Sequence, residues 1–227
     1  VIFTGSHIPL GQIRSDGRDN IISSLLIAAS GQVHEVCIYF NGVLLRGNRS
    51  TKRSSDQFEA FESPNDAPLA HAGIQIEYKK RVLRPASEEA FRFQPFKELP
   101  IGVIKIFPGI QFNYFASLMT DKLKGVVLET FGAGNIPGWA QKALLPIIER
   151  AYQNGTIITV CSQCSQGAVS LGTYAASSAL RRVGAVNGRD MTTEAALAKS
   201  YYLMSISDDM AFVKSQMQKS LRGELTE

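Results

Sequence analysis

A short basic stretch of the sequence combines residue types that could transfer protons. It follows an apolar run and reads Arg46-Gly47-Asn48-Arg49-Ser50-Thr51-Lys52, so that one lysine lies beside two hydroxyls and two arginines. Neighbouring guanidinium charge disfavours the ammonium form of a lysine, which would prepare Lys52 for proton chemistry. The same pattern is also typical of a solvated basic loop, and the stretch alone does not separate the two interpretations.

The segments around this stretch predict a sheet that would position it. Val1-Ile2-Phe3 is an apolar run that stops at Thr4-Gly5-Ser6, and a second run spans residues 36–40. Between them, apolar residues recur at helical spacing over residues 17–31. Strand, helix and strand form a βαβ unit, which needs a parallel sheet. We therefore expect the loop at Ser6 and the loop of residues 41–52 to leave the same sheet edge, where ligands of open α/β sheets bind.

A second α/β layer is predicted after residue 100. Apolar runs and helical stretches alternate there, with strands at 102–107, 125–131 and 156–161 and helices at 112–122, 139–154, 173–183, 192–204 and 208–221. The predicted fold class is α/β with two parallel-sheet, three-layer lobes, the larger N-terminal one truncated and the smaller C-terminal one Rossmann-like or flavodoxin-like. Residues 1–79 would belong to the larger domain, 80–100 would connect the domains, and 101–227 would form the smaller domain.

Composition argues against several classes of protein. The 227 residues are 44% hydrophobic and carry a formal net charge of +4 that is dispersed along the chain, so neither nucleic acid nor a membrane is expected as a partner. The first residues lack the features of a secretory signal, and three cysteines are an odd count for a disulfide framework. Together these observations indicate a cytoplasmic protein.

Motifs for metals and common cofactors are incomplete. Cys161 and Cys164 form a CxxC, but no second CxxC or paired histidines accompany it, so we expect a strand end with small thiols rather than a metal or redox site. The sequence contains neither a GxSxG elbow nor a Walker pattern, and Pro137 takes the third glycine position of a dinucleotide fingerprint that begins at Gly132. No cofactor is therefore expected.

Several ordered blocks of the sequence resemble the cytosolic type I L-asparaginases. They are Thr4-Gly5-Ser6-His7-Ile8-Pro9-Leu10, Arg14-Ser15-Asp16-Gly17, Phe40-Asn41-Gly42, the stretch that ends at Lys52, Gly132-Ala133-Gly134-Asn135, and residues 190–195 and 221–226. The blocks occur in order and at matching spacing over essentially the whole chain. The resemblance implies an amidohydrolase that converts L-asparagine to L-aspartate and ammonia through an acyl-enzyme on a threonine hydroxyl, without a cofactor.

The resemblance also implies roles for individual residues. Lys52 would be catalytic, because it would orient an aspartate and tune the transfer of protons. Ser6 would contact the substrate. Asn135 would reach the active site of a neighbouring subunit, in a homodimer or a homotetramer.

The sequence departs from the family pattern in two places. Neither TGGTI nor HGTDT, the segments that carry the reactive threonines, occurs in the 227 residues. We therefore expect an N-terminal segment of the same protein to precede Val1, and we expect the 227 residues alone to be inactive.

The family's allosteric asparagine site would involve Thr51 and Cys164, but Glu129 stands where that site has an arginine. A carboxylate repels the carboxylate of the ligand, which argues against this regulation.

Two other functions share these blocks. One is the asparaginase-like subunit of a tRNA-dependent amidotransferase, which needs a partner subunit. The other is a catalytically dead homologue that binds an amino acid in the same cleft. Sequence upstream of Val1 would separate the hydrolase from the dead homologue, because it would show whether both threonines exist.

Overall fold

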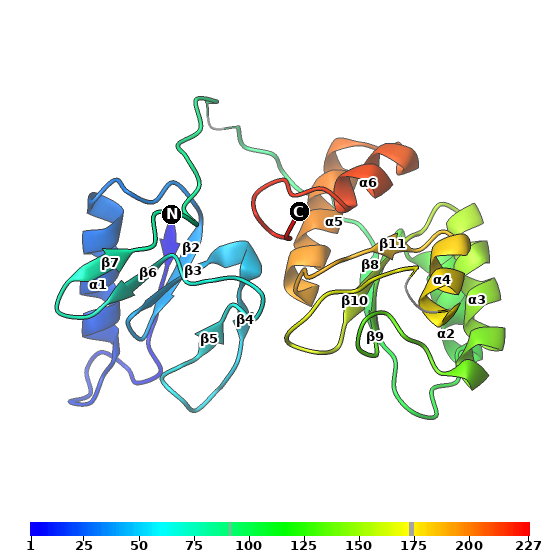
Figure 1. Ribbon diagram of the computed structural model, residues 1–227, viewed down its shortest axis with the longest axis horizontal. Coiled ribbons are helices and arrows are strands. Elements are labelled where there is room, and N and C mark those ends of the chain that lie inside the picture. The colour runs from blue at the N-terminus through cyan, green and yellow to red at the C-terminus, as the bar shows by residue number, and fades with distance from the viewer. Residues whose placement is uncertain (91, 173–174) are drawn as a thin grey trace. The chain divides into compact units, whose positions relative to one another are not determined.

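The chain forms two compact units, Val1–Arg92 and Phe93–Glu227. The computed structural model describes residues 1–90, 92–172 and 175–227 (Figure 1). The boundary between the units falls inside the segment of residues 80–100 that the sequence marks as a connection. Among the described residues, no helix has both the length and the apolar character needed to cross a membrane.

The first unit contains a five-stranded sheet with the order β1-β2-β3-β6-β7 and a two-stranded sheet of β4 and β5. Its elements are β1 (Ile2–Phe3), α1 (Gly17–Ala29), β2 (Cys37–Phe40), β3 (Val43–Arg46), the 3₁₀-helix η1 (Gly47–Arg49), β4 (Thr51–Lys52), β5 (Phe61–Glu62), β6 (Ala70–Ala72) and β7 (Ile76–Tyr78). Strands β1 and β2 are parallel, which confirms the predicted βαβ unit.

The rest of this sheet is antiparallel, so the sheet of the first unit is mixed rather than parallel as expected. The cause is a two-residue hairpin between β2 and β3. Asn41 and Gly42 both have positive φ, at 48° and 78°. Turns of this kind favour Asn-Gly, because glycine carries no Cβ and asparagine tolerates the left-handed region. The hairpin sends the chain back to the end of the sheet from which β2 started.

Helix α1 lies where the sequence predicts it, but its most apolar residues do not face the sheet. Leu25 is 65% exposed and Leu26 is 58% exposed. Ile27 instead joins a buried cluster with Cys37 and Leu44 of the neighbouring strands. The helix therefore carries an exposed apolar side in the first unit.

The second unit is built on a four-stranded parallel sheet with the order β11-β10-β9-β8. Its elements are β8 (Ile101–Lys105), α2 (Asn113–Ser117), the π-helix η2 (Leu118–Lys122), β9 (Gly125–Thr130), α3 (Gly138–Gln153), β10 (Ile157–Ser162), α4 (Ala175–Arg182), β11 (Val186–Asn187), α5 (Thr193–Ile206) and α6 (Met210–Met217). This confirms the predicted parallel lobe. Residues 173 and 174, at the start of one predicted helix, lie outside the described residues.

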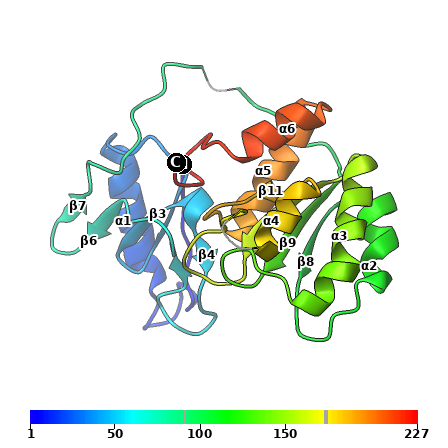
Figure 2. The ribbon, with the colours of Figure 1, turned by 45° about the vertical axis from the view of Figure 1, so that its right-hand side comes forward.

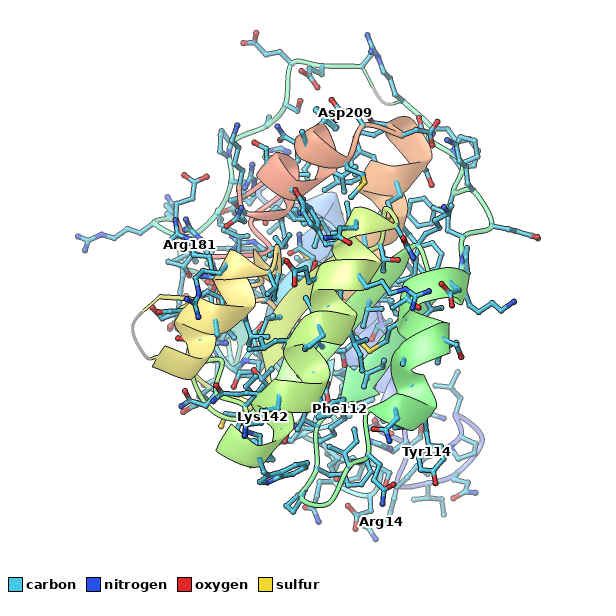
Figure 3. All side chains as sticks on the ribbon, turned by 90° about the vertical axis from the view of Figure 1, so that its right-hand side faces the viewer. Arg14, Phe112, Tyr114, Lys142, Arg181 and Asp209 are labelled. Carbon is cyan, nitrogen blue, oxygen red and sulfur yellow. The ribbon has the colours of Figure 1, made fainter. Side chains whose placement is uncertain are left out.

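Helices cover both faces of this sheet (Figure 2). One buried cluster joins the sheet to α2, α3 and α4 and includes Phe112, Leu144 and Leu180. In Figure 3, Phe112 and Lys142 come from this side, with α2 and α3 next to each other. A second cluster joins the opposite face to α5 and α6 and includes Leu203 and Val213. The C-terminal unit therefore has three layers, as predicted.

Candidate active site

The loop that contains Ser6 is held by the carboxylate of Asp16. This carboxylate accepts hydrogen bonds from the backbone N–H groups of His7 and Ile8, at 3.1 and 3.0 Å, and from the amide of Asn20. Burial acts to raise the pKa of Asp16, but the N–H groups of Ile8 and His7 outweigh it, and the pKa is lowered. Asp16 thereby fixes the exposed Ser6 beside the first turn of α1.

The stretch that ends at Lys52 begins at the opposite end of β2 from Ser6, because of the hairpin. Cys37 pairs with Arg46, and the N–H of Gly47 donates to the carbonyl of Val36 at 2.9 Å. A Cβ at Gly47 would lie 2.9 Å from that carbonyl oxygen, so the close approach needs glycine. The expectation that residues 41–52 form one loop leaving the edge next to Ser6 is therefore corrected.

Aromatic contacts nevertheless bring Lys52 back toward the loop of Ser6. Lys52 pairs with Phe61 across β4 and β5, and its Nζ lies 4.9 Å from the centre of the Phe61 ring. The Phe61 ring lies 5.5 Å from that of Phe40, and the Phe40 ring lies 5.5 Å from that of His7. Lys52 and the residue next to Ser6 are thus joined through two phenylalanines, neither of which was singled out from the sequence for this role.

His7 places an unpaired nitrogen in this region. Its Nε2 is buried and has no hydrogen-bond partner among the described residues. A buried polar atom without a partner is costly, and such atoms concentrate where a ligand or water completes the bonding. The sequence alone did not distinguish this histidine from a surface or core residue.

A buried cluster of charges fixes the other end of the Lys52 stretch. Arg46 is 7% exposed, and its guanidinium donates to Glu35 through Nε and to Asp66 through Nη1, each at 2.5 Å. Its Nη2 donates to the carbonyl of Val82 at 2.7 Å. Burial acts to lower the pKa of Arg46, but the hydrogen bond to Glu35 and the charge of Asp66 outweigh it and raise the pKa. Sequence reasoning missed the two carboxylates, which lie far from Arg46 in the chain.

Of the other candidate residues, Thr51 lies beside Lys52 in β4 of the first unit, whereas Asn135, Cys164 and Glu129 lie in the second unit, at or just after the carboxyl ends of β9 and β10. Asn135 closes a tight turn after β9, in which its N–H donates to the carbonyl of Phe131 at 2.8 Å. Cys164 is exposed just after β10. Gln163 links the strand ends, because its amide donates to the carbonyls of Ile106 and Glu129. This linking residue was not singled out from the sequence.

Glu129 already has partners within the second unit. Its carboxylate accepts a hydrogen bond from the Thr193 hydroxyl at 2.6 Å and lies 3.8 Å from the ammonium of Lys105. Burial and the charge of Glu129 raise the pKa of the Cys161 thiol to about 12. A buried thiol of this kind is inert, in contrast to the exposed Cys164. Within residues 1–90, 92–172 and 175–227, no three His, Cys, Asp or Glu side chains are grouped to hold a metal ion.

These observations define a two-unit α/β protein whose candidate site residues lie within strands or in the loops that follow them. Two family models match it, Asparaginase, N-terminal, over residues 1–84, and Glutaminase/Asparaginase C-terminal domain, over residues 100–217. The chain belongs to the glutaminase/asparaginase family.

Individual relatives match the whole chain. L-asparaginase 1 of Escherichia coli K12 is 40% identical over 226 residues, which cover 100% of this chain and 66% of the relative. The 60 kDa lysophospholipase of Homo sapiens is 40% identical over 228 residues, 100% of this chain and 39% of the relative. The crystal structure of L-asparaginase I from Vibrio cholerae matches with a TM-score of 0.93 and 41% identity, over 100% of this chain and 68% of that chain. The chain thus spans about two thirds of the length of the E. coli relative and about two fifths of the length of the human one.

Proposed function

We propose that the protein containing this chain hydrolyses L-asparagine to L-aspartate and ammonia. The observation that carries the proposal is the contact path from Lys52 through Phe61 and Phe40 to His7, the neighbour of Ser6. This path links Lys52 to the neighbour of Ser6 within the first unit, which supports the roles in catalysis and substrate binding that the family pattern assigns to Lys52 and Ser6. The 40% identity to an L-asparaginase over the whole chain supports the same activity.

The proposed mechanism is attack by a threonine hydroxyl, which forms an acyl-enzyme that water then hydrolyses. A hydroxyl needs a neighbouring base to remove its proton, and Lys52 would support that transfer by orienting an acidic partner. The segments TGGTI and HGTDT are not among the 227 residues, so the proposal assigns both threonines to a part of the protein outside this sequence. Ser6 would contact the substrate, and Asn135 would complete the site of a neighbouring subunit in a homo-oligomer in the cytoplasm.

We propose that asparagine does not regulate this protein through Thr51, Cys164 and Glu129. The Glu129 carboxylate already accepts a hydrogen bond from Thr193 and lies beside the ammonium of Lys105, and it remains a negatively charged group. A second carboxylate brought beside it would be repelled. Initial rates should therefore follow a hyperbola as the asparagine concentration rises, and a sigmoidal curve abolished by Cys164→Ala would contradict this part of the proposal.

The test of the activity is release of ammonia by the full-length protein. We expect turnover of L-asparagine, and measurement with L-glutamine decides between the two amides. Lys52→Met should lower kcat by about a hundredfold or more, because it removes a group in the proton path. Lys142→Met, at an exposed position of α3, is the matched control and should leave kcat unchanged.

Two results would overturn the proposal. One is a full-length protein that binds asparagine without releasing ammonia, as the dead homologue would. The other is Lys52→Met with the kcat of the unmodified protein. Ammonia release that appears only with a co-purifying tRNA-binding subunit would favour the amidotransferase instead.

A further inference from the structure

Arg46 joins segments of the first unit that are far apart in sequence. Through Nε and Nη2 it reaches Glu35, which precedes β2, and through Nη1 it reaches Asp66, which follows β5. Nη2 also donates to the carbonyl of Val82. Glu35 in turn accepts a hydrogen bond from the N–H of Arg84 at 3.0 Å. One guanidinium therefore ties the sheet to the start of the segment that leads toward the second unit.

The charges in this cluster balance. Glu35 and Asp66 face Arg46, and Arg49 adds a second guanidinium whose Nε lies 3.9 Å from Asp66. The side chains of both arginines are at most 9% exposed, so solvent screens these interactions little. A planar guanidinium can donate in three directions at once, and an ammonium in its place cannot reproduce that geometry.

The cluster controls the backbone that leads to Lys52. The hydroxyl of Ser50 donates to the carbonyl of Arg46 at 2.7 Å, and the hydroxyl of Ser63 donates to the carbonyl of Arg49 at 3.1 Å. Asp66 holds Arg46 and Arg49 together from the other side. The backbone from residue 46 to residue 50 is thus fixed before β4 presents Lys52 to Phe61.

The cluster also controls the turn at residues 79–82. The N–H of Val82 donates to the carbonyl of Lys79 at 3.0 Å, while the carbonyl of Val82 is held by Arg46. This turn contains Lys79, Lys80 and Arg81, which are exposed. Its conformation therefore depends on the same side chain that fixes the Lys52 stretch.

We propose that Arg46, held by Glu35 and Asp66, is a positioning residue that couples the Lys52 stretch to residues 82–84 of the connecting segment. The catalytic part of this inference rests on the proposed function, whereas the coupling itself does not. A displacement of the connecting segment would move Arg46 and thereby change the position of Lys52. A displacement of the Lys52 stretch would weaken the hydrogen bond from Arg46 to Val82 and make the turn at residues 79–82 more mobile.

The first experiment measures kcat and KM of the full-length protein with Glu35→Gln, Asp66→Asn and both changes together. Each variant keeps the size of the side chain but replaces one acceptor oxygen by a donor. We expect each to lower kcat about tenfold while KM stays within about twofold, because misplacement of Lys52 affects the reaction more than binding. The double variant should also lose about tenfold rather than a hundredfold, since both changes break one unit.

The second experiment follows trypsin cleavage after Arg81 by mass spectrometry, under native conditions. Glu35→Gln and Asp66→Asn should each speed the appearance of the fragment that begins at Val82 by about tenfold. Asp66→Asn is the sharper variant, because among the described hydrogen bonds and ion pairs Asp66 reaches Val82 only through Arg46. Glu77→Gln, which removes the same charge from an exposed position near the turn, is the control. It should change neither the rate of cleavage after Arg81 nor kcat.

The outcomes separate this inference from the proposed function. If the unmodified protein does not hydrolyse asparagine, the proposed function fails, and faster cleavage of Asp66→Asn still supports the coupling. Unchanged cleavage of Asp66→Asn overturns the coupling whatever the activity. In an active protein, faster cleavage with unchanged kcat overturns the positioning of Lys52. A single cooperative thermal transition, well above the assay temperature, confirms that the variants are folded.

Discussion

A deeply buried ion cluster lies in each unit among the described residues, and the two clusters are built differently. In the first unit, Arg46 meets two carboxylates and a backbone carbonyl from separate segments. In the second unit, Lys199 on α5 meets one carboxylate among the described ion pairs, that of Glu224 at 2.5 Å, and also the carbonyl of Lys219. Both arrangements satisfy a buried cation, but the first needs distant segments to close, whereas the second closes a turn at the end of the chain.

The carboxylates in the two clusters also differ in their dependence on the cation. Glu224 accepts N–H groups from Leu221 and Arg222, at 3.0 and 2.7 Å, in addition to Lys199. Asp66 has only the two arginines among its ion-pair partners in the described part of the chain. Removal of the cation should therefore be more damaging in the first unit, because it takes the described ion-pair partner from Glu35 and leaves Asp66 with the more distant Arg49.

Arg46→Met tests this difference most strongly. It removes the cation but keeps an apolar stem, so Glu35 and Asp66, whose side chains are 5% and 15% exposed, lose their shared partner. We expect the free energy of opening in the first unit to fall by about 4 kcal/mol. Amide hydrogen exchange, resolved by peptide, should show the loss in β2 and β3 and none in α5. A loss below about 1 kcal/mol would mean that the cluster contributes no more to the stability of this unit than a surface ion pair does.

The sequence predicted the elements of the second unit well because their signals are local. The apolar residues of α3 recur at helical spacing, and Leu144 and Ile148 are buried as that spacing requires. Strand β11 was missed, since two residues are too few to show a period. In the first unit, Asn41-Gly42 is a strong signal for a β-hairpin. The prediction that residues 41–52 form a single loop overlooked it.

The arrangement of the candidate site could be predicted only in part. Ring contacts connect Lys52 to His7, the neighbour of Ser6, but the two loops do not leave the shared sheet edge that a parallel sheet would have given. The cluster at Arg46 could not be foreseen, because Glu35 and Asp66 have no distinctive neighbours in sequence and pair only when the tertiary structure closes. Long-range pairing of charges leaves no period in a sequence, unlike the burial of a helix face.

Glu224→Gln sharpens the comparison from the second unit. It removes the charge but leaves an acceptor oxygen for Lys199. The N–H groups of Leu221 and Arg222 lose one of the two carboxylate oxygens that accept their hydrogen bonds. We expect a loss of about 2 kcal/mol at pH 7, which is smaller than for Arg46→Met, measured by hydrogen exchange in α5 and the C-terminal turn.

The effect of Glu224→Gln should depend on pH in a defined direction. Burial acts to raise the pKa of Glu224, but the hydrogen bonds from Lys199 and from the N–H groups of Leu221 and Arg222 outweigh it, so the pKa is lowered from 4.5. A lowered folded-state pKa gives stability that is complete above the unfolded pKa and is lost as the pH falls through the folded pKa. The difference between Glu224→Gln and the unmodified protein should therefore shrink below about pH 4.5. A constant difference down to pH 3 would show that the carboxylate charge is not involved.

Two exposed ion pairs of Arg53 in the first unit should contribute the least stability among these charged contacts. Arg53 directly follows Lys52, and its guanidinium lies 3.5 Å from Glu59 and 3.7 Å from Glu62, with 56% of the side chain exposed. Water and salt screen these charges, so Arg53→Ala should cost about 0.5 kcal/mol or less, and the cost should vanish at 1 M salt. The same salt should leave the loss caused by Arg46→Met almost unchanged, because the cluster at Arg46 excludes the ions that would screen it. If the stability lost in Arg46→Met and in Arg53→Ala depended equally on salt, burial would not protect the Arg46 cluster from screening. The proposed difference between the buried cluster and the exposed ion pairs would then be wrong.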